Sequence, residues 1–95
     1  MEAGKIVKAV VFYEMGAAHM DTIQRAFPGH KALVDLFARQ GKVIAIGTFA
    51  DINDGAMGIF GTREHAEDFV RQDPFVLEGL VGKVTIKDWK ETLLG

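Results

Sequence analysis

The chain has 95 residues, a formal net charge of −2 and a hydrophobic fraction of 48%. This length corresponds to one domain, residues 1–95, and the intermixed charges without a basic stripe argue against nucleic-acid binding. The sequence has no cysteine, which excludes disulfides and thiolate zinc sites, and no apolar run approaches the ~20 residues that cross a bilayer. We therefore expect a cytoplasmic protein without membrane contact, and a core this small favours oligomerisation.

The first half of the chain predicts one strand, a long connection and one helix. Lys5–Tyr13 is rich in valine and aromatic residues, as strands are. Glu14–Gly29 contains two glycines and a proline, and it is interpreted as an irregular connection with one helical turn at Asp21–Ala26. In His30–Gln40, two leucines and a phenylalanine recur at i, i+3 and i+4, which predicts an amphipathic helix that Gly41 ends.

The second half predicts a hairpin, a helix and a final strand. Two strands, Lys42–Ala50 and Ala56–Gly61, flank the polar turn Asp51–Gly55, whose Asp-Gly end is a strong turn signal. Arg63–Gln72 has apolar residues on one face and is expected to be a short helix. Leu80–Trp89 completes the set as a strand, and the residues after it are interpreted as a tail or an arm exchanged with a partner.

The resulting order is β-α-β-β-α-β, which is the α+β ferredoxin-like pattern. Alternate positions in the first two predicted strands are apolar on both faces of the sheet, although two helices can cover only one face. The sheet of a second copy of the chain is the simplest means of burying the other apolar face. The sequence therefore predicts a homodimer of the dimeric α/β barrel type.

His30 is the first candidate for proton chemistry. It follows Pro28-Gly29 and is therefore expected in the first turn of its helix. The unpaired N–H groups and positive dipole end there favour a neutral imidazole, which can accept a proton as a general base must. The alternative is an ordinary polar residue of a first helical turn.

Asp73 is the second candidate, and it also has a structural explanation. Aspartate before proline is a typical N-cap with proline at the first helical position, so Asp73 and Pro74 can start a helical turn. The functional hypothesis is that the carboxylate orients His30 and stabilises its protonated form. A carboxylate has two oxygens, so both roles are compatible, and a split β-α-β fold can bring the two helix boundaries together.

The remaining residue types give weaker signals. His19 and His65 have no metal-site spacing, the glycines match no phosphate-binding loop, and Arg25 stands alone in a polar segment. No metal and no organic cofactor is implied. Tyr13 ends the first predicted strand, where its side chain is placed to face a pocket.

Three motifs resemble the YCII (YciI-like) family of small dimeric proteins, and the resemblance runs from about Lys5 to Trp89. They are the stretch Phe27-Pro28-Gly29-His30, the strand Gly41-Lys42-Val43-Ile44-Ala45-Ile46-Gly47, and Asp73-Pro74-Phe75 followed by Gly79-Leu80 and Trp89. The family is similar in fold to muconolactone isomerases. The resemblance implies a proposed His–Asp active site, which corresponds here to His30 and Asp73.

What the resemblance implies about activity is broad. Some relatives are dehalogenating enzymes acting on hydroxylated aromatics, and many members have no assigned activity. This chain departs from the family where Gly47 is followed by Thr48 instead of proline, and where residues 14–29 lack an arginine-rich stretch. Three hypotheses stay open. The first is a lyase- or isomerase-like enzyme that acts on a compact, cyclic or aromatic, polar metabolite, and the second is a non-catalytic dimer that binds a small ligand. The third is a purely structural dimer, which needs no His–Asp pair.

Overall fold

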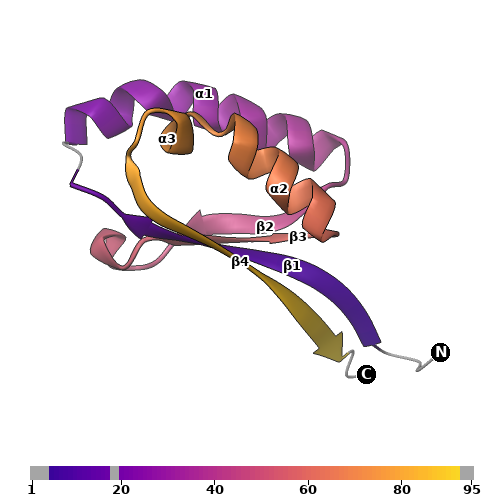
Figure 1. Ribbon diagram of the computed structural model, residues 1–95. Coiled ribbons are helices and arrows are strands. Elements are labelled where there is room, and N and C mark those ends of the chain that lie inside the picture. Colours follow the sequence, from indigo (N-terminus) through magenta and orange to yellow (C-terminus); the bar gives the residue numbers. More distant parts are fainter. Residues whose placement is uncertain (1–4, 18–19, 93–95) are drawn as a thin grey trace.

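The computed structural model describes residues 5–17 and 20–92, and it contains a four-stranded sheet with helices on one face (Figure 1). All strand pairs in the sheet are antiparallel, in the order β2-β3-β1-β4. This is the ferredoxin-like α+β fold that the sequence predicts. In chain order the elements are β1 (Lys5–Met15), α1 (Met20–Arg39), β2 (Val43–Thr48), the 3₁₀ turn η1 (Ile52–Asp54), β3 (Ala56–Phe60), α2 (Arg63–Gln72), α3 (Pro74–Leu77) and β4 (Val81–Thr92).

The long helix α1 corrects the sequence prediction for the first connection. It begins at Met20, not at His30, and it runs through Pro28 and Gly29 to Arg39. Its buried residues Ala26 and Phe37 lie eleven positions apart, close to three helical turns, so one apolar stripe continues across the proline. His30 therefore lies near the middle of a helix, and the argument from a helix N-terminus does not apply to it.

The strand ends also differ from the prediction. β2 ends at Thr48 instead of Ala50, and Phe49 beyond it is exposed. β4 continues past Trp89 to Thr92, where it still pairs with β1, so the described part of the predicted tail, residues 90–92, is strand. His19 and residues 93–95 lie outside the described part of the chain. None of the described helices is long and apolar enough to cross a membrane.

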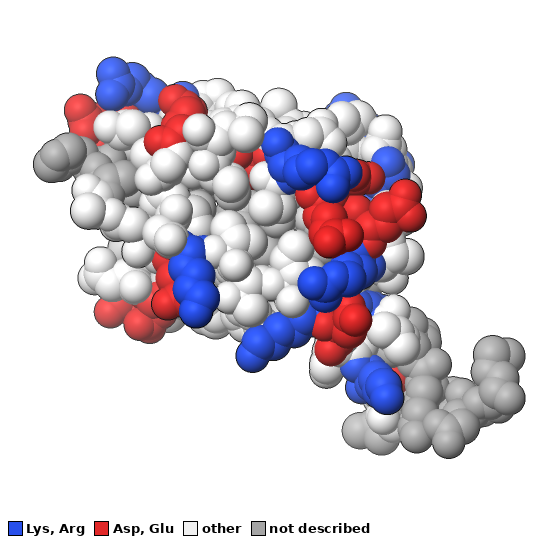
Figure 2. Space-filling view, viewed as in Figure 1, with Lys and Arg blue, Asp and Glu red and all other residues white. Residues whose placement is uncertain are grey.

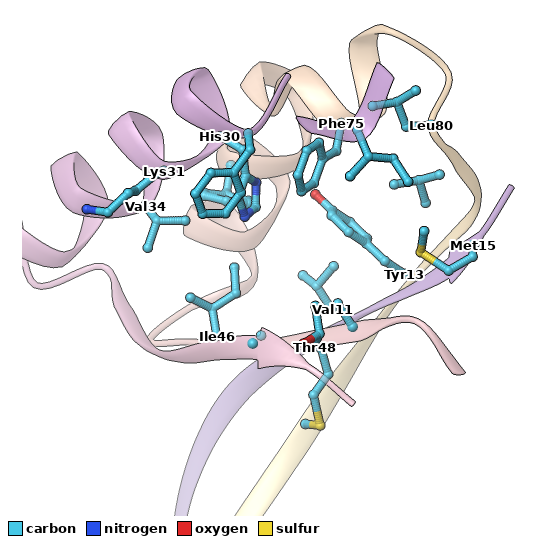
Figure 3. Close-up of a pocket in the computed structure, with 18 of the residues that line it drawn as sticks. Val11, Tyr13, Met15, His30, Lys31, Val34, Ile46, Thr48, Phe75 and Leu80 are labelled. Carbon is cyan, nitrogen blue, oxygen red and sulfur yellow. The ribbon is translucent and has the colours of Figure 1, made fainter. Parts of the chain in front are cut away.

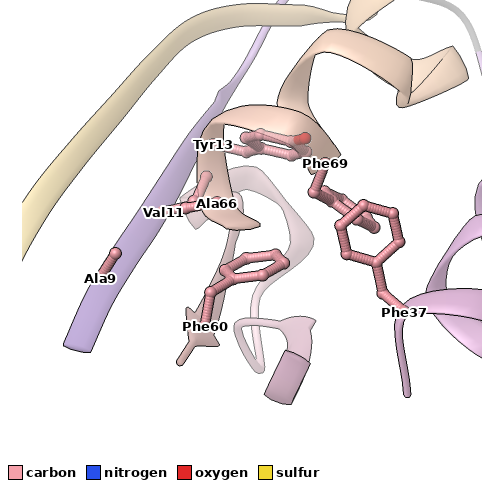
Figure 4. Packing of buried hydrophobic residues seen from close by; sticks show 7 residues of the cluster. All are labelled: Ala9, Val11, Tyr13, Phe37, Phe60, Ala66 and Phe69. Carbon is pink, nitrogen blue, oxygen red and sulfur yellow. The ribbon is translucent and has the colours of Figure 1, made fainter. Parts of the chain in front are cut away.

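The core lies between the sheet and the helices and is dominated by aromatic rings (Figure 4). Phe37 of α1 meets Phe69 of α2 edge to face, with ring centroids 5.3 Å apart, and Phe60 of β3 lies 5.2 Å from Phe69. Such pairs contribute about 0.5–1.5 kcal/mol beyond their buried area. This cluster fixes both helices over the strand that carries Tyr13.

The opposite face of the sheet carries apolar side chains that none of the described helices covers. Val10 and Phe12 of β1 share that face with their strand partners, among them Ile59 of β3. Beyond the end of β3, β1 and β4 continue as a two-stranded arm that projects from the layered body (Figure 1). Trp89 lies on this arm and is 42% exposed.

Candidate active site

The structure brings His30 and Asp73 into direct contact. Nδ1 of His30 on α1 lies 2.9 Å from Oδ1 of Asp73, which stands between α2 and α3. The Asp73 side chain is fully buried and that of His30 is 15% exposed. A buried carboxylate is stable only when it is hydrogen-bonded or paired, so this contact is part of what makes the position of Asp73 tolerable.

Three donors converge on the carboxylate of Asp73. The Tyr13 hydroxyl donates to Oδ2 at 2.7 Å, the backbone N–H of Phe75 donates to Oδ1 at 3.0 Å, and the His30 ring completes the set. An ionised carboxylate is an acceptor only, so Nδ1 of His30 must carry the proton in this contact. In the neutral ring, Nε2 is then the nitrogen free to accept a proton.

The local sequence around Asp73 explains its placement. Asp73 is the C-cap of α2: its N–H donates the last helical bond to the carbonyl of Phe69, and its backbone then turns extended. Its side chain caps α3. Pro74 occupies the first turn of α3, where a missing N–H costs nothing. The predicted capping role is thus present together with the contact to His30.

Gly29 lets α1 come close enough for that contact. A Cβ at this position would lie 3.1 Å from Cγ of Pro74, tighter than ordinary van der Waals contact. The residue next to His30 therefore has no side chain at the point where α1 passes α3. Gly29 is a poor helix residue, and its lack of a side chain is what allows the two helices to approach closely.

Tyr13 is the residue whose role the sequence reasoning missed. Tyr13 faces a cavity, as expected, and its hydroxyl also bonds to Asp73, which the sequence did not predict. The two residues are 60 positions apart, and no local pattern encodes such a pair. Burial raises the pKa of the Tyr13 hydroxyl far above its usual range, and the hydrogen bond to Asp73 and the charge of Asp73 raise it further. Tyr13 therefore stays protonated and donates to Asp73.

The imidazole of His30 is held between aromatic rings. Phe75 stacks on it with centroids 4.2 Å apart and planes 13° from parallel, and Phe69 meets it edge-on at 6.0 Å. One face of the ring is therefore covered, and the ring cannot turn without losing both the stack and the bond to Asp73. A molecule in the cavity can approach His30 only at the parts of the ring that these contacts leave free.

His30 and Tyr13 line a cavity of about 450 Å³ between α1, α3 and the sheet (Figure 3). Its other lining side chains are mostly aliphatic or aromatic, and they come from every strand of the sheet as well as from the helices. The volume falls within the range of small-molecule sites. Among the described residues, no group of three metal-binding side chains is present.

Comparison with known proteins identifies the family. A model of the YCII-related domain matches residues 7–90. Among solved structures, the 5-chloro-2-hydroxyhydroquinone dehydrochlorinase of Burkholderia phenoliruptrix, in complex with 2,5-dihydroxybenzoquinone, aligns with a TM-score of 0.67 at 19% identity, over 87% of this chain and 93% of that one.

Two further structures share the fold at low identity. A protein from Shewanella oneidensis aligns with a TM-score of 0.57 at 10% identity, over 98% of this chain and 96% of that one. A hypothetical protein from Arabidopsis thaliana gives 0.53 at 19% identity, over 95% and 91%. No curated protein sequence matches the chain. The family model covers most of the chain, and the protein belongs to the YCII-related family.

Proposed function

We propose that this protein is a small lyase- or isomerase-like enzyme in which His30 moves a proton on a compact cyclic or aromatic metabolite. The observation that carries the proposal is the contact of His30 with a fully buried Asp73 at the wall of a ligand-sized cavity. Positioned proton transfer of this kind contributes about 10²–10⁴-fold to a rate.

The residues divide the work as follows. Nε2 of His30 takes a proton from the bound molecule, and the negative charge of Asp73 stabilises the imidazolium that forms. Tyr13 and the N–H of Phe75 hold the carboxylate of Asp73 in place. Its Oδ1 therefore stays directed towards His30 while the imidazole gains and loses a proton. The same nitrogen then returns the proton to the substrate or to the leaving group.

The ring-shaped substrate class is supported by the aromatic walls of the cavity. The dehydrochlorinase that shares the fold is named for a chlorinated hydroxyhydroquinone and was solved with a dihydroxybenzoquinone. At 19% identity that likeness concerns the fold, so the substrate class for this chain is our own inference. The competing function, ligand binding without turnover, is favoured by the scarcity of polar groups in the lining.

A substrate screen with matched variants separates the two functions. Hydroxylated aromatics and lactones are incubated with the wild type, with His30→Gln and with His65→Gln, a control histidine on α2 outside the cavity lining. We expect turnover that falls at least about 100-fold in His30→Gln and stays unchanged in His65→Gln. Binding without turnover by the wild type would support the binding function, and turnover that survives His30→Gln would refute the dyad.

We also propose that the protein acts as a homodimer joined through the outer face of the sheet. The support is the apolar row of buried Val10 and half-buried Phe12 and Ile59 on that face together with the exposed Trp89. Contiguous apolar surface that stays accessible to water marks interaction surfaces. Location in the cytoplasm and activity without a cofactor remain predictions from the sequence.

A further inference from the structure

The cavity is poor in groups that can bind an anion. Among the described residues that line it, four have side chains with nitrogen or oxygen atoms: Tyr13, His30, Lys31 and Thr48. The lining described here includes no arginine. The hydroxyl of Tyr13 is already committed, because it donates to Asp73 at 2.7 Å. A bound anion therefore has the edge of His30, the hydroxyl of Thr48 and the ammonium of Lys31 as its candidate side-chain donors in the described lining.

Lys31 directs its ammonium away from the cavity (Figure 3). Its ammonium lies 2.8 Å from Oδ2 of Asp35, one turn further along α1, and its side chain is 60% exposed. Figure 3 shows that the nitrogen points away from His30 and Tyr13, so only the aliphatic stem of Lys31 contributes to the wall. The ammonium of Lys31 and the carboxylate of Asp35 form an ion pair at the surface, in contact with water and outside the cavity.

The buried charge beside the cavity is negative. Asp73 lies directly behind His30 and is fully buried, and its contacts are three hydrogen-bond donors of which only His30 can be cationic. A carboxylate or phosphate on the ligand would be desolvated in this cavity, because the lining includes apolar side chains such as Phe60, Phe69 and Phe75. Among the described lining residues it would meet no cation that is directed into the cavity, and the negative charge of Asp73 would repel it, strongly so where water is excluded.

From this arrangement we propose, resting on the proposed function, that the site selects uncharged ring compounds and excludes those with a permanent anionic group. The ring occupies the apolar part of the cavity, and a phenol, enol or activated C–H group meets His30. Carboxylated, sulfonated and phosphorylated analogues of the same ring are rejected. Charge thus acts as a filter separate from size, since a cavity of about 450 Å³ has room for either form.

The matched probes for this filter are 2-naphthol and 2-naphthoate, whose dissociation constants are measured near pH 7 by calorimetry or NMR titration. We expect the wild type to bind 2-naphthol at least about tenfold more tightly, equivalent to ~1.4 kcal/mol. Equal affinity for the two probes would overturn the proposal, and so would a failure to bind 2-naphthol at millimolar concentration.

Two variants separate charge selection from a general preference for apolar molecules. Lys31→Met keeps an aliphatic side chain in the wall and removes the ammonium, so it should leave the affinity for 2-naphthoate unchanged within about twofold. Thr48→Lys places a cation on the lining at an exposed strand end, and it should strengthen 2-naphthoate binding relative to 2-naphthol binding. Weaker naphthoate binding in Lys31→Met, or an unchanged ratio of the two affinities in Thr48→Lys, would show that the site lacks the charge filter.

The outcome can be told apart from failure of the proposed function. Binding of the two probes requires no turnover, so the filter can be present in a protein with no catalytic histidine. If His30→Gln leaves turnover in the screen unchanged while the protein still binds 2-naphthol more tightly than 2-naphthoate, the catalytic proposal is wrong and the charge filter is supported. If turnover depends on His30 but both probes bind equally, the charge filter fails alone.

Discussion

Asp73 combines three tasks in one buried carboxylate. It caps α3, accepts the hydroxyl of Tyr13, and contacts His30 through the same oxygen that accepts the N–H of Phe75. Because the helix cap and the His30 contact share Oδ1, the position of the imidazole is tied to the start of α3. The orientation of His30 is thus supported by backbone structure as well as by side chains.

Replacing Tyr13 by Phe should destabilise the protein at neutral pH. The change keeps the ring in the core but leaves Oδ2 of the buried Asp73 without its donor. An unsatisfied buried acceptor costs about 1–3 kcal/mol, and we expect a loss of this size in the free energy of unfolding measured by urea at pH 7. A loss below about 0.5 kcal/mol would mean that the hydroxyl makes no important bond.

The same variant should respond differently to alkaline pH. The pKa of Tyr13 is raised, chiefly by burial, so the folded protein keeps this hydroxyl protonated where the unfolded chain begins to ionise it near pH ~10. The stability contribution is complete below that pH and is lost as the pH rises towards the folded value. Above pH ~10 the wild type should lose up to about 1.4 kcal/mol per pH unit that Tyr13→Phe does not lose.

The control is internal, because Tyr13 is the single tyrosine of the chain and the lysines are the same in both proteins. The difference in unfolding free energy between wild type and Tyr13→Phe should therefore shrink from pH 10 to pH 11. A constant difference would show that Tyr13 ionises equally in the folded and unfolded states.

At the level of elements, α1 shows where sequence reasoning failed. Pro28 and Gly29 are poor helix residues and predicted a loop, yet the helix continues through both. Pro28 cannot donate a helical hydrogen bond, which destabilises the helix locally. Packing of the apolar stripe against the core stabilises the helix, and this packing depends on the whole fold. Helix propensities along the sequence describe only the local destabilisation, so they could not predict that packing would outweigh it.

Much of the fold and part of the site were readable from the sequence. The β-α-β-β-α-β order follows from periodicity and turn residues, and the cap formed by Asp73 with Pro74 is a local signal. The bond between Tyr13 and Asp73 and the stack of Phe75 on His30 depend on how distant elements pack. No spacing rule along the chain contains that information.

The turn before β3 offers a matched test of close packing. Gly55 has φ of 91°, and a Cβ there would lie 1.9 Å from the backbone oxygen of Tyr13, whereas Gly79 has φ of 72° and open space. Gly79→Ala should cost about 1–2 kcal/mol, from backbone strain alone. Gly55→Ala should cost about 1–3 kcal/mol more, because the strand carrying Tyr13 must shift and because the backbone at Gly55, with ψ of −147°, lies in a region open essentially to glycine alone. Equal costs in thermal or urea unfolding would show that this contact is not tight.

At the level of the whole molecule, the two faces of the sheet differ in their cover. The helices cover one face, while Phe12 and Trp89 lie on the other with the ammonium of Lys87 5.9 Å from the Phe12 ring. On the side seen in Figure 2, positive and negative side chains are interspersed and leave broad uncharged areas. A second copy is the partner that we propose for the outer face of the sheet.

The arm offers a pair of substitutions that tests this dimer. Trp89 pairs with Lys8 and faces the outer side, whereas Val7, 58% exposed, is the next residue of β1 and faces the helix side. Trp89→Glu should raise the dimer dissociation constant at least about tenfold in sedimentation, and Val7→Glu should leave it nearly unchanged. A wild type that sediments as a monomer at micromolar concentration would contradict the dimer, and equal effects of both changes would contradict the outer face as its interface.

The account depends most on proton transfer by His30, which can be followed directly as hydrogen–deuterium exchange at an activated ring C–H of a phenolic ligand in D₂O. The signal is the loss of that proton from the NMR spectrum of the ligand, with the wild type, His30→Gln and His65→Gln compared at equal ligand occupancy. We expect the wild type and His65→Gln to catalyse exchange at least about 100-fold faster than His30→Gln. Exchange at the same rate in all three proteins would contradict a catalytic role for His30 and Asp73.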